Sequence, residues 1–486
     1  MSNKQKGFAK DSVVYGAGEA VSKIGSIILV PILSRLFLPG DYGIIDLLSL
    51  SYGFVREAIS LNMYTGLQKF FYLKEGEDRK NLLSSVFFFR FLLSSLCAVI
   101  IIVFSSHINI LAFGGTDYSA AIILLAILLP FDDVFIGLML LLRLKRSAVV
   151  FSIFSVIQVI ILPICTYVCV VHLHFGIVGV FLAKLISTLI TILPMFLIQR
   201  REFSQNIISK YAIDVTKFSV PGLPGAIIMD IMNIIPRYLL AFFSTLTAVG
   251  IFGMADRIAN IVLNFRSAFN LAWNPFAFAN MGKPDERYLY EKVFKTFGFM
   301  LISVGLFTTL FAKEALIILT PPTYYSAAPL VGGLSFYHAV RALDLVFYTG
   351  LYSVNRVSHT SLLEAVKLFA FAASAIILIP NYGAIGLVVS LDIAIVIFFI
   401  CYAFTIKRHF PFSFSLHRIS FMLAIAIMGS AFTMIHLVSD KINLDILFLK
   451  SIFMAIYVII GYFIIFTRNE RISAQNKIRT FWLSQS

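Results

Sequence analysis

The sequence predicts an all-α polytopic membrane protein with about fourteen transmembrane helices, arranged as two six-helix halves and two further helices. Composition is the first observation behind this prediction. Of the 486 residues, 59% are hydrophobic and 13% are charged, whereas soluble domains carry about 25% charged residues. The second observation is a series of apolar stretches of transmembrane length. The third is the alternation of basic and non-basic links between them, which assigns each link to one side of a membrane.

Each expected span is close to or above the ~20 residues that a helix needs to cross a hydrocarbon core. The first follows a polar segment that contains Lys4, Lys6 and Lys10. Because it is of full transmembrane length, we expect it to be retained as a helix and not removed as a signal peptide. In chain order the expected spans are residues 13–37, 43–66, 81–104, 120–142, 148–171, 176–198, 218–243, 248–279, 292–319, 329–352, 359–380, 384–406, 416–438 and 447–467.

The links on one side of the predicted membrane are rich in Lys and Arg, and the opposite links hold only Lys441. Because basic loops stay on the cytoplasmic side, we place both termini in the cytoplasm. Topology thereby explains the formal net charge of +14, and we expect no nucleic-acid partner. The basic, inner links include residues 69–80, 143–146, 199–217, 283–295, 407–408 and the tail from residue 468.

Two short motifs recur at one distance along the chain. Gly43, which opens the second span, corresponds to Gly250 in the eighth, 207 residues later. Gly176, which opens the sixth span, corresponds to Gly383 before the twelfth at the same distance. The repeat favours a duplication of six spans, with a pseudo-twofold axis along the membrane normal and a cleft between the halves. The expected parts are an N-terminal half, a C-terminal half, and two last helices with a cytoplasmic tail: 1–210, 211–410 and 411–486.

Polar side chains recur on single helical faces inside the spans, such as Tyr52 with Arg56 and Asn233 with Arg237. A charge at mid-bilayer costs about 2.5–3.5 kcal/mol even on the mild insertion scale, so such residues generally face a bundle interior or a watery cavity. The arginines outnumber the nearby acids, and we expect them not to be neutralised one by one. A guanidinium group binds phosphate through two hydrogen bonds, and Tyr and Asn suit sugar hydroxyls, so the expected cargo carries an anionic, polar head group. The candidate substrate-binding residues are Lys23, Arg56, Arg90, Arg237, Arg257, Arg266, Arg341, Tyr52, Asn233, Asn260 and Tyr337.

A second interpretation of these charges is structural, because side chains three or four residues apart meet on a helix and can neutralise each other. Both interpretations stay open on the sequence alone. The pairs with suitable spacing are Glu19–Lys23, Arg341–Asp344 and Glu364–Lys367.

Carboxylates inside the spans are candidates for coupling transport to Na⁺ or H⁺, or for packing in a polar seam. Asp132-Asp133 and Asp392 are isolated carboxylates at mid-span. We expect no other cofactor: Cys165 and Cys169 have no histidine beside them and do not indicate a metal site. No nucleophile, base or phosphate-loop pattern is present, which predicts a transporter and not an enzyme. The candidate ion-coupling residues are Glu19, Asp133, Asp230, Asp344 and Asp392.

Four short motifs resemble those of a known family. They are Val30-Pro-Ile-Leu-Ser-Arg-Leu-Phe-Leu-Pro-Gly-Asp-Tyr-Gly43, Phe218-Ser-Val-Pro-Gly-Leu-Pro224, Pro236-Arg-Tyr238 and Val249-Gly-Ile-Phe252. The chain resembles the O-antigen (Wzx-type) flippases of the multidrug/oligosaccharidyl-lipid/polysaccharide exporter (MOP) superfamily. Pro236 stands where that family often has Asp. The resemblance implies a MATE-like fold in a bacterial inner membrane.

The same resemblance implies an exporter that moves an undecaprenyl-pyrophosphate-linked oligosaccharide repeat unit to the periplasmic leaflet, for surface polysaccharides such as O-antigen. Implied partners are that lipid-linked oligosaccharide, membrane lipids, and a polysaccharide polymerase with its chain-length regulator.

Three alternatives remain. An ion-coupled multidrug (MATE-type) antiporter is disfavoured, because cationic drugs require an acidic cavity and this chain has an excess of Arg. A polymerase or glycosyltransferase is disfavoured by the short outer links, of which Ser105–Ser119 is the longest. A scaffold that transports nothing is the third.

Overall fold

The computed structural model describes residues 28–114, 116–354, 356, 358–410, 416–435, 443–468 and 470–472. Most of the expected first span lies outside these residues, as do the candidates Glu19 and Lys23. All regular secondary structure in the described residues is helical, which confirms the all-α prediction.

The chain divides into two compact units, unit 1 (Met1–Ala241) and unit 2 (Phe242–Ser486). The expected division into three parts, at residues 210 and 410, describes duplicated halves and not compact units. It stays a prediction. The helices that follow residue 210, α9 and the greater part of α10, belong to unit 1 as a compact body.

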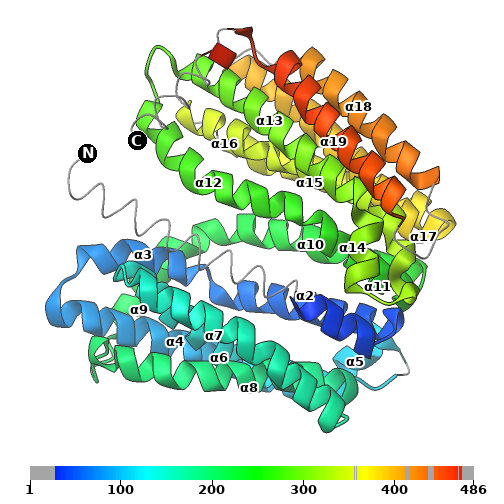
Figure 1. Cartoon of the computed structure of the whole chain (residues 1–486). Helices are drawn as coiled ribbons and strands as arrows, with labels where there is room; N and C mark the ends of the chain where they lie inside the picture. The colour runs from blue at the N-terminus through cyan, green and yellow to red at the C-terminus, as the bar shows by residue number, and fades with distance from the viewer. Residues whose placement is uncertain are drawn as a thin grey trace, which may run out of the picture. The chain divides into compact units, whose positions relative to one another are not determined.

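The described part of unit 1 starts with helical residues 28–36, and its helices are drawn in blue to green in Figure 1. α6 packs against α4 and α8, and α7 packs against α8. The helices are α2 (Pro39–Ser60), α3 (Met63–Leu73), α4 (Gly76–Val103), α5 (Ser105–Phe113), α6 (Ser119–Leu144), α7 (Ala148–Tyr167), η1 (Val168–His172), α8 (Gly176–Gln199), η2 (Arg200–Glu202), α9 (Ser209–Ser219), η3 (Val220–Gly222) and α10 (Leu223–Phe243).

The expected second span, 43–66, is broken into α2 and α3. Leu61 and Asn62 lie between the two helices with left-handed φ angles of 47° and 53°. Such angles end a helix, because they remove two residues from the helical hydrogen-bond series. α3 is therefore free to lie in a different direction from α2.

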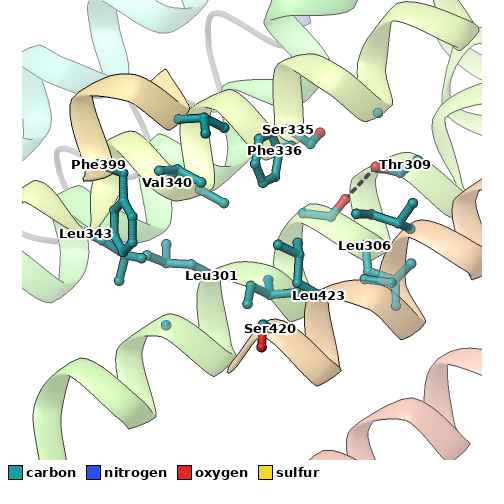
Figure 2. Close-up of a pocket in the computed structure, with 18 of the residues that line it drawn as sticks. Leu301, Leu306, Thr309, Ser335, Phe336, Val340, Leu343, Phe399, Ser420 and Leu423 are labelled. Atoms are coloured by element: carbon teal, nitrogen blue, oxygen red, sulfur yellow. Dashed lines mark hydrogen bonds between the residues drawn. The ribbon is translucent and has the colours of Figure 1, made fainter. Parts of the chain in front are cut away.

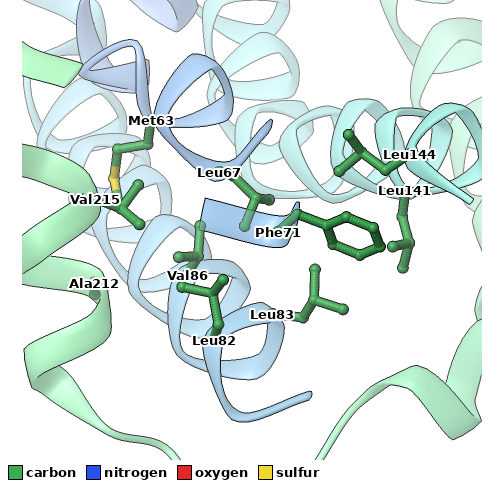
Figure 3. Packing of buried hydrophobic residues seen from close by; sticks show 10 residues of the cluster. All are labelled: Met63, Leu67, Phe71, Leu82, Leu83, Val86, Leu141, Leu144, Ala212 and Val215. Carbon is green, nitrogen blue, oxygen red and sulfur yellow. The ribbon is translucent and has the colours of Figure 1, made fainter. Parts of the chain in front are cut away.

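One end of unit 1 is closed by an apolar cluster between α3, α4, α6 and α9 (Figure 3). Met63 and Leu67 on α3 face Val86 on α4 and Val215 on α9. The basic links 69–80 and 143–146 adjoin this cluster, so it lies at the predicted inner end. α9 is thus an amphipathic helix packed under the bundle and not a span.

Unit 2 contains the remaining helices, and three of the expected spans are again interrupted; span 292–319 divides into α13 and α14 at Phe311. Span 248–279 divides into α11 and α12 at Asn260, and span 329–352 divides into α15 and α16 at Leu343. Thr245 caps the N-terminus of α11 by accepting a hydrogen bond from the Ala248 amide at 3.1 Å. The helices are α11 (Leu246–Ala259), α12 (Ile261–Asn280), α13 (Glu286–Leu310), α14 (Ala312–Leu319), η4 (Pro322–Ala327), α15 (Ala328–Ala342), α16 (Asp344–Ser353), α17 (Ser358–His409), α18 (Leu416–Ile435) and α19 (Leu444–Ile465).

α17 is a helical hairpin with two arms. Gly383 interrupts it with φ 55° and ψ −128°, a conformation that only glycine adopts without strain. Ser374 on the first arm lies 3.5 Å from the carbonyl oxygen of Ser390 on the second. Nearer the other end, the Lys367 ammonium lies 4.8 Å from the centre of the Phe398 ring. The arms therefore run side by side, and they coincide with the expected spans 359–380 and 384–406.

The second repeated motif has one geometry in both units. Gly176 and Gly383 have φ angles of 52° and 55°, and each stands at a turn before a long helix. Three residues later, a Cβ on Gly179 would lie 3.0 Å from the carbonyl oxygen of Cys169, and one on Gly386 would lie 2.1 Å from that of Leu378. Both turns thus need glycine for the close return of the chain, which supports the duplication.

α19 is fastened to α13 and α14 at both ends. The Lys450 ammonium lies 2.6 Å from Glu314 on α14, and the Lys295 ammonium of α13 lies 2.8 Å from Glu470, just beyond α19. Between them Gly461 lets the Phe299 ring approach, since a Cβ there would lie 2.1 Å from that ring. The last helix is thus a fixed part of unit 2.

Nine helical segments in the described residues are long and apolar enough to cross a membrane. Both arms of α17 are contained in one of the nine. The chain is therefore a multi-pass membrane protein, whereas the count of about fourteen spans stays a prediction.

Candidate functional site

The Asp132 cluster, which consists of Tyr52, Arg56, Asp132 and Lys184, brings three helices of unit 1 together. The Tyr52 hydroxyl on α2 donates a hydrogen bond of 2.7 Å to the Asp132 carboxylate on α6, and Arg56 Nη1 lies 3.1 Å from the same oxygen. The Lys184 ammonium on α8 lies 4.4 Å from the centre of the Tyr52 ring. It is also close enough to Asp132 for electrostatic attraction. One carboxylate therefore serves two cations.

Asp133, the next residue on α6, forms a closed contact with Arg90 on α4. Arg90 Nε donates to one carboxylate oxygen at 2.9 Å and Nη2 donates to the other. Arg90 Nη1 also donates to the carbonyl oxygen of Ser60 at 2.7 Å. That oxygen lies at the end of α2, where the helix break leaves it without an N–H partner in the helix. The guanidinium group supplies the missing hydrogen bond.

Tyr64 on α3 completes this contact. Its hydroxyl donates to the backbone carbonyl of Asp133 at 2.6 Å, and its ring lies 3.8 Å below the Arg90 guanidinium carbon. Gly137 makes room for it, since a Cβ there would lie 2.5 Å from the Tyr64 hydroxyl. The contact therefore fixes the positions of α3, α4 and α6.

α10 is tied to α2 through the candidates of the seventh span. Arg237 Nε lies 2.7 Å from the Asp46 carboxylate, and its Nη1 donates to the carbonyl oxygen of Asn233 at 3.0 Å. The hydroxyls of Tyr238 and Ser51 lie 2.7 Å apart. The candidate Asp230 is close enough to Arg56 for electrostatic attraction.

Unit 2 holds a second polar cluster on α11, α12 and α15–α17. Asp256 accepts from Asn260 Nδ2 at 3.0 Å and lies 2.8 Å from His338 Nε2. Arg266 Nη2 on α12 donates to Asp344 at 2.8 Å. The remaining candidates of this unit are Arg257 on α11, beside Asp256, and Tyr337 and Arg341 on α15; Arg341 lies within electrostatic range of Asp344, Glu364 and Asp256.

The expectation that the arginines are not individually neutralised is wrong for four of them. The partners stand on other helices, as with Arg237 and Asp46, which are 191 residues apart in the chain. Helical periodicity detects only partners within one helix, so it missed them. The four ion pairs are Arg56–Asp132, Arg90–Asp133, Arg237–Asp46 and Arg266–Asp344.

The expectation of isolated carboxylates is wrong for Asp132 and Asp133 for the same reason. The expected pairing within one helix is confirmed for Glu364 and Lys367. For Asp344 the expectation is incomplete, since this carboxylate also binds Arg266 on another helix.

In the described part of the chain, Asp392 forms no ion pair. Its Oδ2 packs against Gly333 on α15, where a Cβ would lie 2.8 Å away. Its Oδ1 is buried without a hydrogen-bond partner in the described part of the chain. An unpaired buried carboxyl group is costly, so its role as an ion-coupling candidate stays a prediction.

Sequence reasoning missed Lys184, Asp46, His338 and Tyr64. Lys184 had a usable signal, because it is the single charged residue between Gly176 and Gln199. Asp46 had one as well, because it is a carboxylate inside the expected span 43–66. His338 and Tyr64 had no such signal, since their importance lies in partners that only folding brings near.

An apolar pocket of about 370 Å³ lies between α13, α15, the second arm of α17 and α18 (Figure 2). Leu301, Leu306 and Leu423 project into it, and its polar side chains are the hydroxyls of Thr309, Ser335 and Ser420. It suits a hydrocarbon chain and not a charged group. In the residues that the structure describes, no group of three or more His, Cys, Asp or Glu could hold a metal ion.

Residues 32–329 match the model of a family described as "Polysaccharide biosynthesis protein". Among curated proteins, none matches the sequence significantly.

The fold is similar to that of several solved transporters. Lipid II flippase MurJ, in an inward closed conformation, has a TM-score of 0.74 at 13% identity, over 93% of this chain and 99% of that one. A multidrug resistance MATE family transporter of the MOP superfamily has a TM-score of 0.58 at 15% identity, over 84% and 97%. A MOP superfamily transporter from Pyrococcus furiosus, for which a reversed polarity of the binding pocket is described, has a TM-score of 0.57 at 16% identity, over 84% and 96%. The predicted MATE-like architecture is thus confirmed.

Proposed function

The chain belongs to the polysaccharide biosynthesis protein family, and from this membership we propose that it is a flippase for lipid-linked oligosaccharides. In this proposal it moves an undecaprenyl-pyrophosphate-linked repeat unit from the cytoplasmic to the periplasmic leaflet of a bacterial inner membrane, for assembly of a surface polysaccharide such as O-antigen. The fold it shares with a lipid II flippase and with MATE transporters supports a transport role over catalysis.

The Asp132 cluster is the observation that carries the proposal. Arg56 and Lys184 carry two positive charges, whereas the Asp132 carboxylate that they share carries one negative charge. A second anion that binds beside them is therefore attracted, and it is not buried without a counter-charge. The Arg56 side chain is 34% exposed and is therefore reachable. A phosphate oxygen can then replace Asp132 on the guanidinium group, because it accepts the same Nη1–H hydrogen bond that Asp132 accepts.

We propose Tyr52, Arg56 and Lys184 as the phosphate-binding residues of unit 1. Arg90 is a weaker candidate, because its side chain is 5% exposed and both carboxylate oxygens of Asp133 already occupy it. The other candidates, whose roles remain proposals, are Lys23, Arg237, Arg257, Arg266, Arg341, Asn233, Asn260 and Tyr337.

The apolar pocket of unit 2 supports a lipid-linked cargo. A polyprenyl chain is long and uncharged, and the leucine and isoleucine side chains around the pocket give it contacts like those of lipid. We propose that part of the carrier chain enters this pocket.

Flipping of a fluorescent undecaprenyl-pyrophosphate oligosaccharide in proteoliposomes tests the proposal. We expect Arg56→Gln and Lys184→Gln each to lower the initial rate about tenfold, as loss of a charged hydrogen bond of ~1.5 kcal/mol implies. Lys80→Gln is the matched control, since Lys80 binds Glu77 at the surface. Unchanged rates in both test variants would refute the phosphate site, and no flipping by the wild-type chain would refute the function.

The same vesicles distinguish the proposed coupling ions. A Na⁺ gradient and a pH gradient are imposed separately, and the one that accelerates flipping identifies the ion. The candidate residues are Glu19, Asp133, Asp230, Asp344 and Asp392. Asp392 is tested first, because no cation pairs with it among the described residues: Asp392→Asn is expected to abolish the acceleration. Efflux of cationic drugs without flipping would favour a MATE-type antiporter instead.

The proposed partners beyond the cargo are a polysaccharide polymerase and its chain-length regulator, which would receive the exported unit. Co-purification of a polymerase from a membrane that makes the polysaccharide tests this proposal.

A further inference from the structure

A basic cluster without carboxylates lies where the two arms of α17 end, at the predicted inner side of unit 2. It consists of Arg356, His359, Arg408 and His409. The rings of His359 and His409 are 5.0 Å apart between centres and inclined by 58°, so the start of the first arm meets the end of the second. Arg356 and Arg408 are exposed. The cluster is therefore accessible from the inner membrane surface.

Three cations of the other inner links each have a carboxylate partner. Lys145 binds Glu202 at 2.6 Å, Lys80 binds Glu77 at 2.6 Å, and Lys295 binds Glu470 at 2.8 Å. In the part of the chain that the structure describes, no carboxylate forms an ion pair with any member of the cluster.

The sequence around the cluster is also poor in acidic residues. From Asn355 to Arg418 it contains two acidic residues, Glu364 and Asp392. Glu364 is bound to Lys367. Asp392 stands sixteen residues before Arg408 on the same arm, or about 24 Å along a helix at 1.5 Å per residue. Basic residues that serve only to orient the chain in the membrane can lie close to acidic residues, so this separation indicates a further role.

The histidines make the cluster sensitive to pH. His409 is the last residue of α17 and lies three residues beyond Ile406, the last residue of the predicted twelfth span. Partial removal from water and repulsion by His359, Arg356 and Arg408 lower the pKa of His409 below its usual value. These are the groups that act on it from both arms and from the segment before α17, and none of them is acidic. His359 Nδ1 is buried without a hydrogen-bond partner among the described residues.

We propose that Arg356, His359, Arg408 and His409 form a phosphate-binding site, which holds the phosphate group of an anionic lipid in the inner leaflet. Two guanidinium groups bind the phosphate oxygens, and the imidazole N–H groups add hydrogen bonds when protonated. A bound anion stabilises the imidazolium form, so binding takes up a proton. Affinity for a phosphodiester, whose charge is constant between about pH 5 and 8, therefore rises as the pH falls. The site is separate from the Asp132 cluster and does not depend on the cargo.

Native mass spectrometry of the full chain, released from detergent with phosphatidylglycerol or phosphatidylcholine, tests the site. We expect the wild type to retain phosphatidylglycerol preferentially, and more of it at pH 5.5 than at pH 8. Arg356→Gln with Arg408→Gln should lower retention by about fivefold per cation removed. His359→Gln with His409→Gln should remove the pH effect. Lys145→Gln, whose lysine already has a carboxylate partner, is the matched control.

Inorganic pyrophosphate distinguishes the lipid from a soluble source of the same chemistry. If it displaces phosphatidylglycerol at low millimolar concentration, the site takes free phosphates as well. If it does not, the site selects a headgroup held in the membrane. Equal retention of both lipids by the wild type, or retention unchanged by the arginine substitutions, would overturn the proposal.

A measurement on the wild type tests the phosphate-binding site even if a variant fails to fold. The pKa of His409, followed by NMR of histidine-labelled protein in nanodiscs, should rise when phosphatidylglycerol replaces phosphatidylcholine. The same pKa in both lipids would contradict the site.

Discussion

At the scale of single residues, the two neighbouring aspartates of α6 have different surroundings. Asp133 is enclosed with Arg90, whose side chain also binds the carbonyl of Ser60. Asp132 shares its charge between Arg56 and Lys184, and Arg56 is partly exposed. Adjacent side chains on a helix point about 100° apart. One aspartate thus stabilises the helices while the other remains available for exchange with an anion.

Asp133→Asn should destabilise the protein strongly, because it leaves the buried Arg90 guanidinium without its counter-charge. Loss of one partner of a buried ion pair costs about 3–5 kcal/mol. We expect a clear fall in the midpoint of thermal unfolding in detergent. The double variant Arg90→Met, Asp133→Leu should recover part of the loss, since no single charge remains buried. A midpoint for Asp133→Asn equal to that of the wild type would show that the pair is not structural.

Gly137→Ala should be destabilised by crowding. The new methyl group would meet the Tyr64 hydroxyl at 2.5 Å and the Phe87 ring at 2.7 Å, and overpacking of this kind costs about 1–3 kcal/mol. Gly53→Ala is the matched control, since a Cβ there has nothing within 4 Å and Ala favours the helix. Unfolding midpoints of both variants check this, and equal shifts would refute it.

At the scale of elements, breaks in the helices position the polar clusters. α2 ends at Ser60, beside Arg90; α11 ends at Ala259, next to Asn260; and α15 gives way to α16 at Leu343, next to Asp344. A helix break frees backbone groups and redirects the side chains that follow it. Interrupted spans within a membrane are tolerated where they line a polar interior, as the neighbouring ion pairs indicate here.

The docking of α19 gives a prediction at this scale. Gly461→Leu should separate α19 from Phe299, whose ring leaves no space for a side chain, and should lower the unfolding midpoint. Ala455→Leu on the exposed face of the same helix controls for hydrophobicity. Greater protease cleavage between α18 and α19 in the Gly461 variant is the second readout. If both variants behave alike, α19 is not held by this contact.

At the scale of the whole molecule, alternate basic links predict which ends of the helices share a side of the membrane. The two ends of the α17 hairpin illustrate this. Tyr382 lies at its tip and is expected outside, and Arg408 lies at its base and is expected inside. Because the arms are antiparallel, the two positions must be on opposite sides if each arm crosses once.

Cysteine accessibility in a chain without native cysteines tests this topology. Tyr382→Cys should react with an impermeant maleimide in intact cells, and Lys407→Cys should react only after permeabilisation. Ser374→Cys with Ser390→Cys should in addition form a disulfide, since the two positions are close on facing arms. Labelling of both positions from outside would contradict the predicted hairpin orientation.

The sequence by itself determined that this protein is helical and spans a membrane, and it predicts the sidedness and the repeat. Apolar length, basic links and glycine spacing are local or periodic properties, and a bilayer acts on them directly. Only the tertiary structure decided which charges neutralise each other. Ion pairs need side chains within about 4 Å, and the partners here, such as Arg90 with Asp133 or Arg237 with Asp46, are 43 and 191 residues apart. Helical periodicity orders residues around one axis and carries no information on which helix stands opposite, so the Asp132 cluster emerged only when α2, α6 and α8 were packed together.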